Sequence, residues 1–469
     1  QKSNAKSSTF FGGAAILAAS IAVVKVIGAL YKIPLGRILG DVGFGHFNNA
    51  YAIYNLLLMV STAGLPVAMS KTISEANALN RRNQVSRVFH VALVTFIILG
   101  SISSLIMFLF AQPLANLQGD SLAAPAVRVM ALSCFFVCTM SAYRGYAQGH
   151  SDMVPTAVSQ VLEAMTKLIV GLFLAWYLLR LGFGSEFSAA GAIAGVTASG
   201  LVSLVYLMIR FRRKNSAQGL AKTDDRPESA KHTLKVLASI AIPITLSASM
   251  VSIITLIDTS LVQGQLQNAL GYTLKETRHL YGTYSSGMNL YNLPSSMMTA
   301  LTISVIPTVS ASLARNDRVH TSRVINSSLR VTGLMAFPMG LGLWALAEPI
   351  MKLCYPRYDS ELGGSLLAVL GIASMFVCLM LISNSILQSY GRVHVPVFTM
   401  LLGGVVKIVL NYNLTAVPSI NIHAAPFGTL TCFVIVAVLN LYFVYRTMED
   451  KHHYLRVFAK PLIASLLMA

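Results

Sequence analysis

The chain has 469 residues, of which 55% are apolar and only 11% are charged, and its formal net charge is +18. A soluble domain carries roughly 25% charged residues, so this composition excludes a soluble enzyme, a disordered chain and a disulfide-stapled secreted domain. The five cysteines are scattered without a CxxC or Cys/His spacing, so we expect no metal site. The chain begins without methionine and stops inside an apolar run, and we expect both ends to be trimmed.

Apolar segments long enough to cross a membrane follow one another along the whole chain. A spanning helix needs about 20 mostly apolar residues, and only a helix satisfies its backbone groups within one segment. The pattern predicts an all-α polytopic membrane protein with twelve full spans and the start of a thirteenth near residue 457. The full spans are expected at 10–33, 47–70, 87–111, 124–146, 155–180, 189–211, 234–262, 281–309, 324–350, 364–388, 393–415 and 423–446.

The basic residues predict how these spans are oriented. With the N-terminus in the cytoplasm, the cytoplasmic loops hold roughly three times as many Lys and Arg residues as the outer loops. This asymmetry explains the positive net charge without nucleic acid as a partner. The longest polar stretch, 212–232, has the composition of a solvated linker.

The two halves of the sequence resemble each other. Tyr54-Asn55 recurs as Tyr291-Asn292, and Lys167 recurs as Lys407, at an offset of about 236–242 residues. We therefore expect two pseudo-symmetric six-helix lobes, between which a transporter would bind its substrate. A duplicated scaffold without transport is the alternative. The expected parts are 1–211 for the N-lobe, 212–232 for the linker, 233–446 for the C-lobe and 447–469 for the start of a C-terminal helix pair, whose last helix is truncated.

Cations in the first span are the strongest candidates for substrate binding. A charge at a helix centre costs about 2.5–3.5 kcal/mol in the membrane, so it is seldom present without a role. Lys25 lies near the middle of the first span, and Lys32 and Arg37 lie at its outer end. Three cations on one helix predict a cavity that holds an anionic headgroup, with snorkelling to the interface as the alternative.

Two pairs of opposite charges are candidates for coupling or gating. Glu163 and Lys167 stand at i and i+4, which predicts an intrahelical ion pair with either a structural or a gating role. Asp258 and Lys407 lie at compatible depths in the seventh and eleventh spans, and Asn411 follows Lys407 by one turn. We expect a buried salt bridge or coupling site there, because either charge alone would be costly.

Uncharged and interfacial groups complete the candidate site. The matched residues Tyr54, Asn55, Tyr291 and Asn292 would bind a sugar or phosphate, or would pack between helices. Arg144 would meet an anionic substrate at the cytoplasmic face, or would anchor the helix there. A membrane glycosyltransferase or ligase is the alternative from another class. It would need paired catalytic residues in the outer loops, and none is evident.

Several segments carry a resemblance to a known family. They are 25–40 (KVIGALYKIPLGRILG), 50–54 (AYAIY), 141–149 (SAYRGYAQG) and 155–160 (PTAVSQ). These segments resemble the SpoVB/YtgP branch of the MOP exporter superfamily, which contains stage V sporulation protein B and MurJ-type lipid II flippases. The resemblance implies a MATE-like fold of two six-helix lobes plus two C-terminal helices, with a central cavity walled by the first, second, seventh and eighth helices.

The resemblance also implies a function and a setting. It implies a flippase, not an enzyme, that moves an undecaprenyl-pyrophosphate-linked cell-wall precursor, lipid II above all, across the bacterial cytoplasmic membrane by alternating access. Another polyprenyl-linked oligosaccharide, or a small molecule as in the MATE antiporters, is the alternative substrate. We expect a monomer in the bilayer that could associate with cell-wall synthesis proteins.

The resemblance further assigns roles to single residues. Lys25 falls where MurJ-type proteins carry an essential arginine, and Lys32 lies beside the position of their next cation. Some of these proteins bind sodium at a site where Asp258 and Asn411 would be ligands. Lys407 stands where a neutral ligand would be expected, so its ammonium would replace the ion and no cofactor or metal is expected. Coupling to protons, sodium or the membrane potential stays unassigned.

Overall fold

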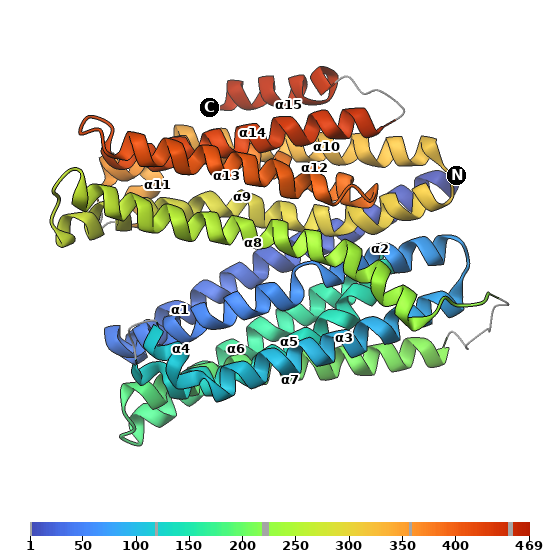
Figure 1. Ribbon diagram of the computed structural model, residues 1–469, viewed down its shortest axis with the longest axis horizontal. Helices are drawn as coiled ribbons and strands as arrows, with labels where there is room; N and C mark the ends of the chain where they lie inside the picture. Colours follow the sequence, from blue (N-terminus) through green and yellow to red (C-terminus); the bar gives the residue numbers. More distant parts are fainter. Residues whose placement is uncertain (1, 118–120, 218–224, 356–358, 449–453) are drawn as a thin grey trace. The chain divides into compact units, whose positions relative to one another are not determined.

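The computed structural model describes residues 2–117, 121–217, 225–355, 359–448 and 454–469, so parts of the predicted linker and C-terminal segment lie outside it. The described residues form helices that belong to two compact units, Gln1–Thr245 and Leu246–Ala469 (Figure 1). Among the described residues, ten helices are long and apolar enough to cross a membrane, or eleven if one bent pair counts as a span. These helices confirm an all-α polytopic membrane fold.

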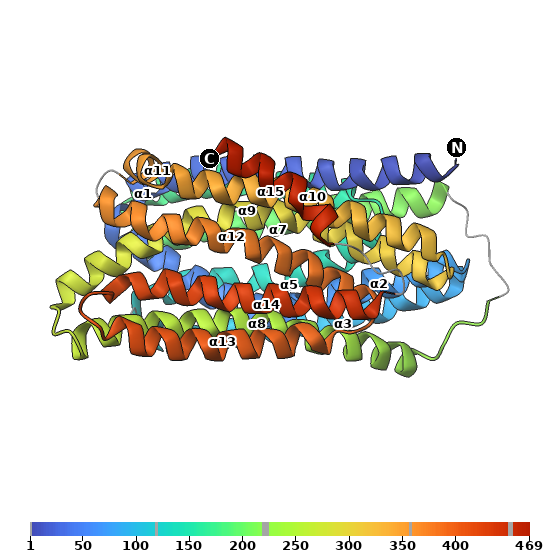
Figure 2. The same ribbon diagram turned by 90° about the horizontal axis from the view of Figure 1, so that it is seen from above.

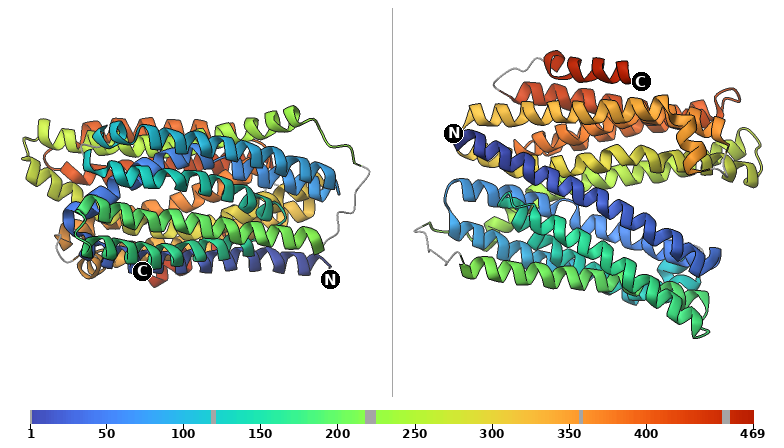
Figure 3. Two further views of the ribbon diagram at one scale, coloured as in Figure 1. Left: turned by 90° about the horizontal axis from the view of Figure 1, so that it is seen from below. Right: turned by 180° about the vertical axis from the view of Figure 1, so that it is seen from behind.

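The described part of the first unit is built from seven helices and the beginning of an eighth. Its helices α5, α6 and α7 run side by side, with α3 against α5 and α1 against α6 (Figure 3). The helices are α1 (Lys2–Thr62), α2 (Leu65–Ala78), α3 (Arg82–Leu109), α4 (Ala111–Leu117), α5 (Ala124–Gly149), α6 (Val154–Arg180), α7 (Ser185–Ala217) and the first turns of α8 (Ala230–Asn268), with a 3-10 turn at Ser121–Ala123.

Helix α1 consists of two segments that fold back on each other at Gly40. This residue has φ 64° and ψ −177°, a conformation that glycine adopts without steric cost. The rings of Tyr31 and Phe47 are 6.1 Å apart, whereas 16 residues of straight helix would separate them by about 24 Å. The segment after Gly40, together with α2, therefore stands where the sequence predicts the second span at 47–70.

The second unit holds the remaining helices. Helix α12 packs against α9, α10 and α14, and α13 packs against α14 (Figure 2). The bend between α10 and α11 is 77°. Besides the rest of α8, the helices are α9 (Leu274–Ala314), α10 (Arg318–Ala345), α11 (Ala347–Cys354), α12 (Ser360–Ser389), α13 (His394–Thr415), α14 (Ala424–Thr447) and α15 (Tyr454–Met468), with a 3-10 turn at Asn421–His423.

Matching turns in the two units support the internal repeat. Asn80, between α2 and α3, has φ 56°, and Asn316, between α9 and α10, has φ 55°. Ser151, between α5 and α6, has φ 57°, and Gly391, between α12 and α13, has φ 77°. Gly and Asn adopt left-handed conformations readily, and Ser151 adopts one at the position that Gly391 holds in the other half. Both halves thus reverse the chain through a left-handed residue at matching positions, at an offset of about 236–240 residues.

The sequence predicts the boundary between the two halves at the polar linker, 212–232. In the structure, the boundary between the units lies further along the chain, inside α8, after Thr245. The first turns of α8 pack tightly on the first unit, because Gly64 has no side chain. The backbone N–H of Gly64 donates to Thr245 Oγ1 at 3.1 Å. A Cβ atom at Gly64 would overlap the carbonyl oxygen of Ala241. This contact joins the first turns of α8 to the residue that precedes α2.

The linker is attached to the first unit by a helix cap. The carboxylate of Asp225 accepts hydrogen bonds from the backbone N–H groups of Asn83 (3.1 Å) and Gln84 (3.0 Å), in the first turn of α3. Arg81 occupies the N-cap position of α3 and has no side-chain acceptor for these groups. In the second unit, Asp317 caps α10 with its own carboxylate. A linker residue thus replaces the cap that the first repeat lacks.

Candidate functional site

A buried ion pair joins α8 and α13 inside the second unit. Lys407 Nζ lies 2.9 Å from Asp258 Oδ2, and the two side chains are only 5% and 4% exposed. Asn411 lies one turn beyond Lys407, and its Nδ2 donates to the other carboxylate oxygen of Asp258. Because a buried carboxylate is costly without partners, this arrangement, which the sequence predicts, satisfies both of its oxygens.

Glycines allow the helices around this pair to approach closely. A Cβ atom at Gly404 would overlap Ile254 of α8, and one at Gly403 would lie 2.6 Å from Val436 of α14. Gly428 of α14 packs directly against the side chain of Asn411. The close approach of α13 to its neighbours brings Lys407 within reach of Asp258, so the Gly403-Gly404 pair acts through packing.

The site does not fit the sodium ion that the resemblance implies. Asp258 and Asn411 are oxygen-bearing residues of the kind that sodium would use, but the ammonium of Lys407 already contacts the Asp258 carboxylate. A second cation there would be repelled by Lys407. Within the part of the chain that the structure describes, no group of three His, Cys, Asp or Glu side chains could hold a metal ion.

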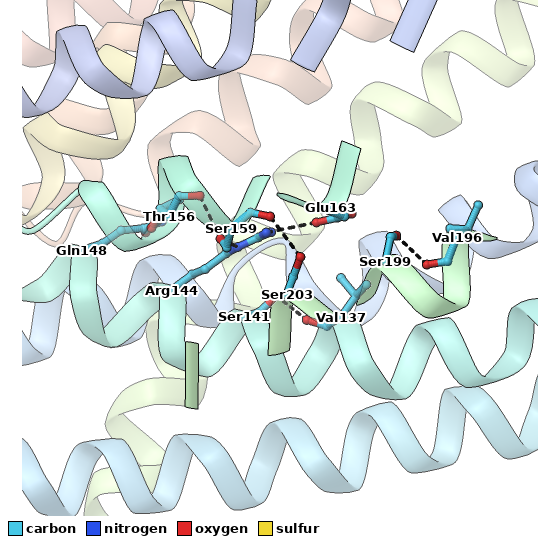
Figure 4. Close-up of polar contacts among 10 residues, drawn as sticks. All are labelled: Val137, Ser141, Arg144, Gln148, Thr156, Ser159, Glu163, Val196, Ser199 and Ser203. Carbon is cyan, nitrogen blue, oxygen red and sulfur yellow. Dashed lines mark hydrogen bonds and ion pairs between the residues drawn. The ribbon is translucent and has the colours of Figure 1, made fainter. Parts of the chain in front are cut away.

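A second ion pair joins α5 and α6 in the first unit (Figure 4). Arg144 Nη2 lies 3.0 Å from Glu163 Oε2, and Arg144 Nε donates to Ser159 Oγ at 2.9 Å. The hydroxyl of Ser203, on α7, donates to the backbone carbonyl of Ser159 at 3.0 Å. Three helices thus meet at one polar cluster, in which the Arg144 side chain is 15% exposed.

The ion-pair partner of Glu163 in this cluster differs from the one that the sequence predicts. The sequence predicts an ion pair with Lys167 at i+4, but the carboxylate pairs with Arg144, because a neighbouring helix brings a guanidinium closer. Lys167 instead has its ammonium 5.5 Å from the centre of the Tyr31 ring, a cation–π arrangement. Arg144 is thus engaged inside the unit at a position where the sequence suggests contact with substrate.

The three cations of the first span have exposed side chains. Lys25 lies within the candidate span Ala15–Gly40, and Lys32 and Arg37 lie closer to its end. None of the described side chains forms an ion pair with Lys25. An uncompensated charge at this depth makes Lys25 the strongest candidate in the first unit for contact with an anion.

The matched Tyr-Asn pairs behave alike in the two units. Tyr54 and Tyr291 are each 4% exposed and lie in the cores of their units, Tyr54 with its ring 5.7 Å from that of Tyr51. Asn55 and Asn292 are exposed, and Asn292 Nδ2 donates to a carbonyl of its own helix at 2.8 Å. The tyrosines are therefore packed inside their units, and the asparagines are the exposed members of this set.

Sequence reasoning missed several residues of these clusters. Ser159 and Ser203 carry no charge, and hydroxyls are common within helices, so neither stands out. Asp225 could have been suspected, since Arg81 cannot cap a helix and its counterpart in the repeat is an acidic residue. The contact at Gly64 has no comparable signal in a single sequence.

The fold defines a class, that of polytopic helical membrane proteins with two compact units, each with an ion pair that joins two of its helices. The chain belongs to the polysaccharide biosynthesis protein family, whose model matches residues 11–313, and the MatE model matches residues 243–413. Both matches agree with the resemblance to the MOP exporter superfamily.

Individual relatives support the same assignment. The chain is 28% identical over 434 residues to the uncharacterized membrane protein YabM of Bacillus subtilis (strain 168), covering 92% of this chain and 79% of that protein. It is 25% identical over 440 residues to stage V sporulation protein B of the same organism (92% and 83%). It is 24% identical over 423 residues to the lipid II flippase MurJ, also from Bacillus subtilis (87% and 78%).

Solved structures show the same fold at low sequence identity. An outward-facing multidrug resistance MATE family transporter of the MOP superfamily aligns with a TM-score of 0.78 at 14% identity, covering 95% of this chain and 96% of that one. The MATE transporter VcmN of Vibrio cholerae in its bent form aligns with a TM-score of 0.79 at 13% identity (100% and 99%). The family models and the relatives, together with this fold, identify the chain as a MOP-superfamily transporter and not an enzyme.

Proposed function

We propose that this transporter flips an undecaprenyl-pyrophosphate-linked cell-wall precursor, lipid II, across the bacterial cytoplasmic membrane by alternating access. The observation that carries the proposal is the 24% identity over 423 residues to a protein named lipid II flippase MurJ. The positive-inside pattern favours an N-terminus in the cytoplasm. The protein would act as a monomer that could associate with cell-wall synthesis proteins.

The physical requirement for such a substrate is a cation in the membrane. A pyrophosphate cannot enter hydrocarbon unaided, because the transfer of an unpaired charge from water is very unfavourable. The exposed ammonium of Lys25 would replace part of its hydration, and Lys32 and Arg37 would bind it towards the end of the span. The polyprenyl tail would stay in the bilayer, so no covalent step is needed.

The ion pair of the second unit is our candidate for coupling. Asp258 contacts both Lys407 and Asn411, and the Lys407 ammonium takes the place beside the carboxylate that a metal cation would need. Proton binding to Asp258 or a response to the membrane potential would fit this set better than sodium. Arg144, Glu163 and Lys167 would gate the first unit by exchanging partners.

The family model supports a second candidate substrate, another polyprenyl-linked oligosaccharide. The description of that model is polysaccharide biosynthesis protein, and it matches residues 11–313. Another polyprenyl-linked oligosaccharide has the same pyrophosphate and the same lipid tail, and differs only in its glycan. Lys25 would therefore bind the pyrophosphate of either candidate substrate.

A reconstituted flipping assay tests the proposal. The full chain in liposomes should flip lipid II, Lys25→Ala should abolish flipping, and Lys25→Arg should retain it. Lys235→Ala removes an exposed lysine outside the first span and serves as the matched control. Flipping by Lys25→Ala at the rate of the unaltered chain would contradict the role of Lys25. Transport of other polyprenyl glycans in preference to lipid II would replace the first substrate with the second.

A further inference from the structure

A cavity of about 490 Å³ opens at one end of the first unit, apart from the clusters described above. It is lined by Asp152, in the turn between α5 and α6, and by Tyr206, Ile209, Arg210 and Arg213, on α7. The candidate spans on either side of Asp152 end at Gly149 and begin at Val154, and the span of α7 ends at Arg213. The cavity therefore lies where these helices leave the hydrocarbon, at the depth of lipid headgroups.

The charges in this cavity favour an anion. Arg210 and Arg213 stand at i and i+3, so they project from the same face of α7. Both side chains are exposed, and among the described residues neither guanidinium has an ion-pair partner within 4.0 Å. Asp152 is the single carboxylate among the described residues that line the cavity, so these residues carry a formal net charge of +1.

Aromatic residues adjoin the cavity. A second hollow shares Asp152 and Arg210 with it and is also lined by Tyr143, Tyr146 and Phe211. The Phe211 ring is 5.0 Å from the ring of Tyr146, and both rings pack against Phe89. Amphipathic rings concentrate at the membrane–water interface, where one side meets acyl chains and the other meets headgroups. The site thus offers cations for a phosphate and an apolar wall for the lipid attached to it.

We propose that this cavity binds the headgroup of an anionic phospholipid of the phosphatidylglycerol type. Arg210 and Arg213 would hold the phosphate, and the glycerol hydroxyls would donate to Asp152 or exchange hydrogen bonds with Tyr206. Phosphatidylethanolamine has no net charge and would leave the excess positive charge of the cavity uncompensated. Basic pockets between helices at this level are known to hold anionic headgroups. This site is separate from Lys25 and does not depend on the identity of the transported substrate.

Native mass spectrometry of the purified full chain tests this proposal. Phosphatidylglycerol and phosphatidylethanolamine with identical acyl chains are titrated separately, and we expect phosphatidylglycerol to bind at least about tenfold more tightly. The Arg210→Gln/Arg213→Gln variant should lose roughly 30-fold in affinity for phosphatidylglycerol and should no longer distinguish the two lipids. Arg82→Gln/Arg87→Gln removes the same charge from exposed positions of the same unit, outside the cavity, and should leave the affinity unchanged.

Three results would overturn the proposal. Equal binding of the two lipids to the unaltered chain would show that the headgroup is not recognised. An equal loss in both double variants would show that only the overall charge matters. Displacement of phosphatidylglycerol by millimolar inorganic phosphate would show that the cavity recognises phosphate and not a lipid. If the cavity variant loses thermal stability, the single variant Arg213→Gln, at the end of α7, answers the same question.

Discussion

Lys407 Nζ lies 2.9 Å from Asp258 Oδ2 inside the second unit, and each side chain is at most 5% exposed. Each of these two charges compensates the other, because burial of either one alone would be energetically unfavourable. The net contribution of the ion pair to stability is small, but the loss of one member leaves an uncompensated charge. The pair therefore fixes how α8 and α13 are placed within the unit.

Single neutralisation of this pair should destabilise the protein strongly. We expect Lys407→Met or Asp258→Asn to lower the free energy of unfolding by about 3–5 kcal/mol, and the double variant to recover most of that loss. Thermal unfolding in detergent measures these differences. Arg81→Ala removes the half-exposed pair with Glu228, at 3.7 Å, and should cost at most about 1 kcal/mol. A double variant as unstable as the two single variants together would contradict the pairing.

The exchange of charges tests the coupling role of the same residues. If the two charges act only as a pair, Asp258→Lys with Lys407→Asp should restore part of the flipping that either single neutralisation abolishes. Asn411 donates to Asp258 and would need to reorient in the exchanged variant, so full recovery is not expected. Normal expression without any recovery of flipping would argue against a role for the pair itself.

The partner of Glu163 can be identified by a double-mutant cycle. Arg144 and Glu163 should show a coupling free energy of about 1.5–3 kcal/mol, since their contact is a partly buried, charge-assisted hydrogen bond. The cycle between Lys167 and Glu163 is the matched comparison, and its coupling should be below about 0.5 kcal/mol. Chemical unfolding in detergent supplies the data. A larger coupling for Lys167 would restore the pairing that the sequence predicts.

The contact between α2 and α8 should not tolerate a side chain at Gly64. We expect Gly64→Ala to destabilise the first unit by about 1–3 kcal/mol, because the new Cβ would overlap the backbone of Ala241. Gly28→Ala is the control, since that glycine lies in a helix with nothing within 4 Å of an added Cβ. There, the better helix propensity of alanine should leave stability unchanged or increase it by about 0.5–1 kcal/mol. Equal melting temperatures for both variants would refute the close contact.

Removal of the linker carboxylate should loosen the start of α3. We expect Asp225→Ala to cost about 0.5–2 kcal/mol and to speed hydrogen exchange at Asn83 and Gln84, whose N–H groups lose their acceptor. Asp317→Ala removes the corresponding cap of α10 and should affect only that helix. Unchanged exchange at Asn83 in Asp225→Ala would contradict the cap.

The first turn of α9 should become less stable at acidic pH. Thr273 and Glu276 form a capping box, and the hydrogen bonds from the Thr273 side chain and backbone lower the pKa of Glu276. A lowered carboxyl pKa means that the cap is complete above about pH 4.3 and is lost as the pH falls through the lowered value. Hydrogen exchange at Thr273, corrected for the intrinsic effect of pH, measures this loss. Glu276→Gln should show no such pH dependence, and equal protection of the unaltered chain at pH 3 and pH 6 would contradict it.

Patterns along the chain were enough to predict the class of fold and the ion pair between Asp258 and Lys407. Long apolar runs have few alternatives to membrane-spanning helices, so hydropathy alone indicated the helical bundle. The matched Tyr-Asn pairs indicated the repeat. Asp258 and Lys407 could be paired in advance because two opposite charges buried at similar depth have few other partners.

Other contacts depended on how the helices are packed, which a single sequence does not show. Glu163 had two candidate ion-pair partners, Lys167 four residues away and Arg144 on the neighbouring helix. Only the way α5 packs beside α6 shows that Arg144 is the partner. No periodic pattern in the sequence predicts the reversal at Gly40, the cap from Asp225 or the contact at Gly64. Each of these features brings together segments that are separate in the chain. Hydrophobic patterning thus determined which segments enter the membrane and become helices. Tertiary structure alone decided which polar groups meet, because a hydrogen bond or ion pair depends on a few ångströms between elements far apart in the chain.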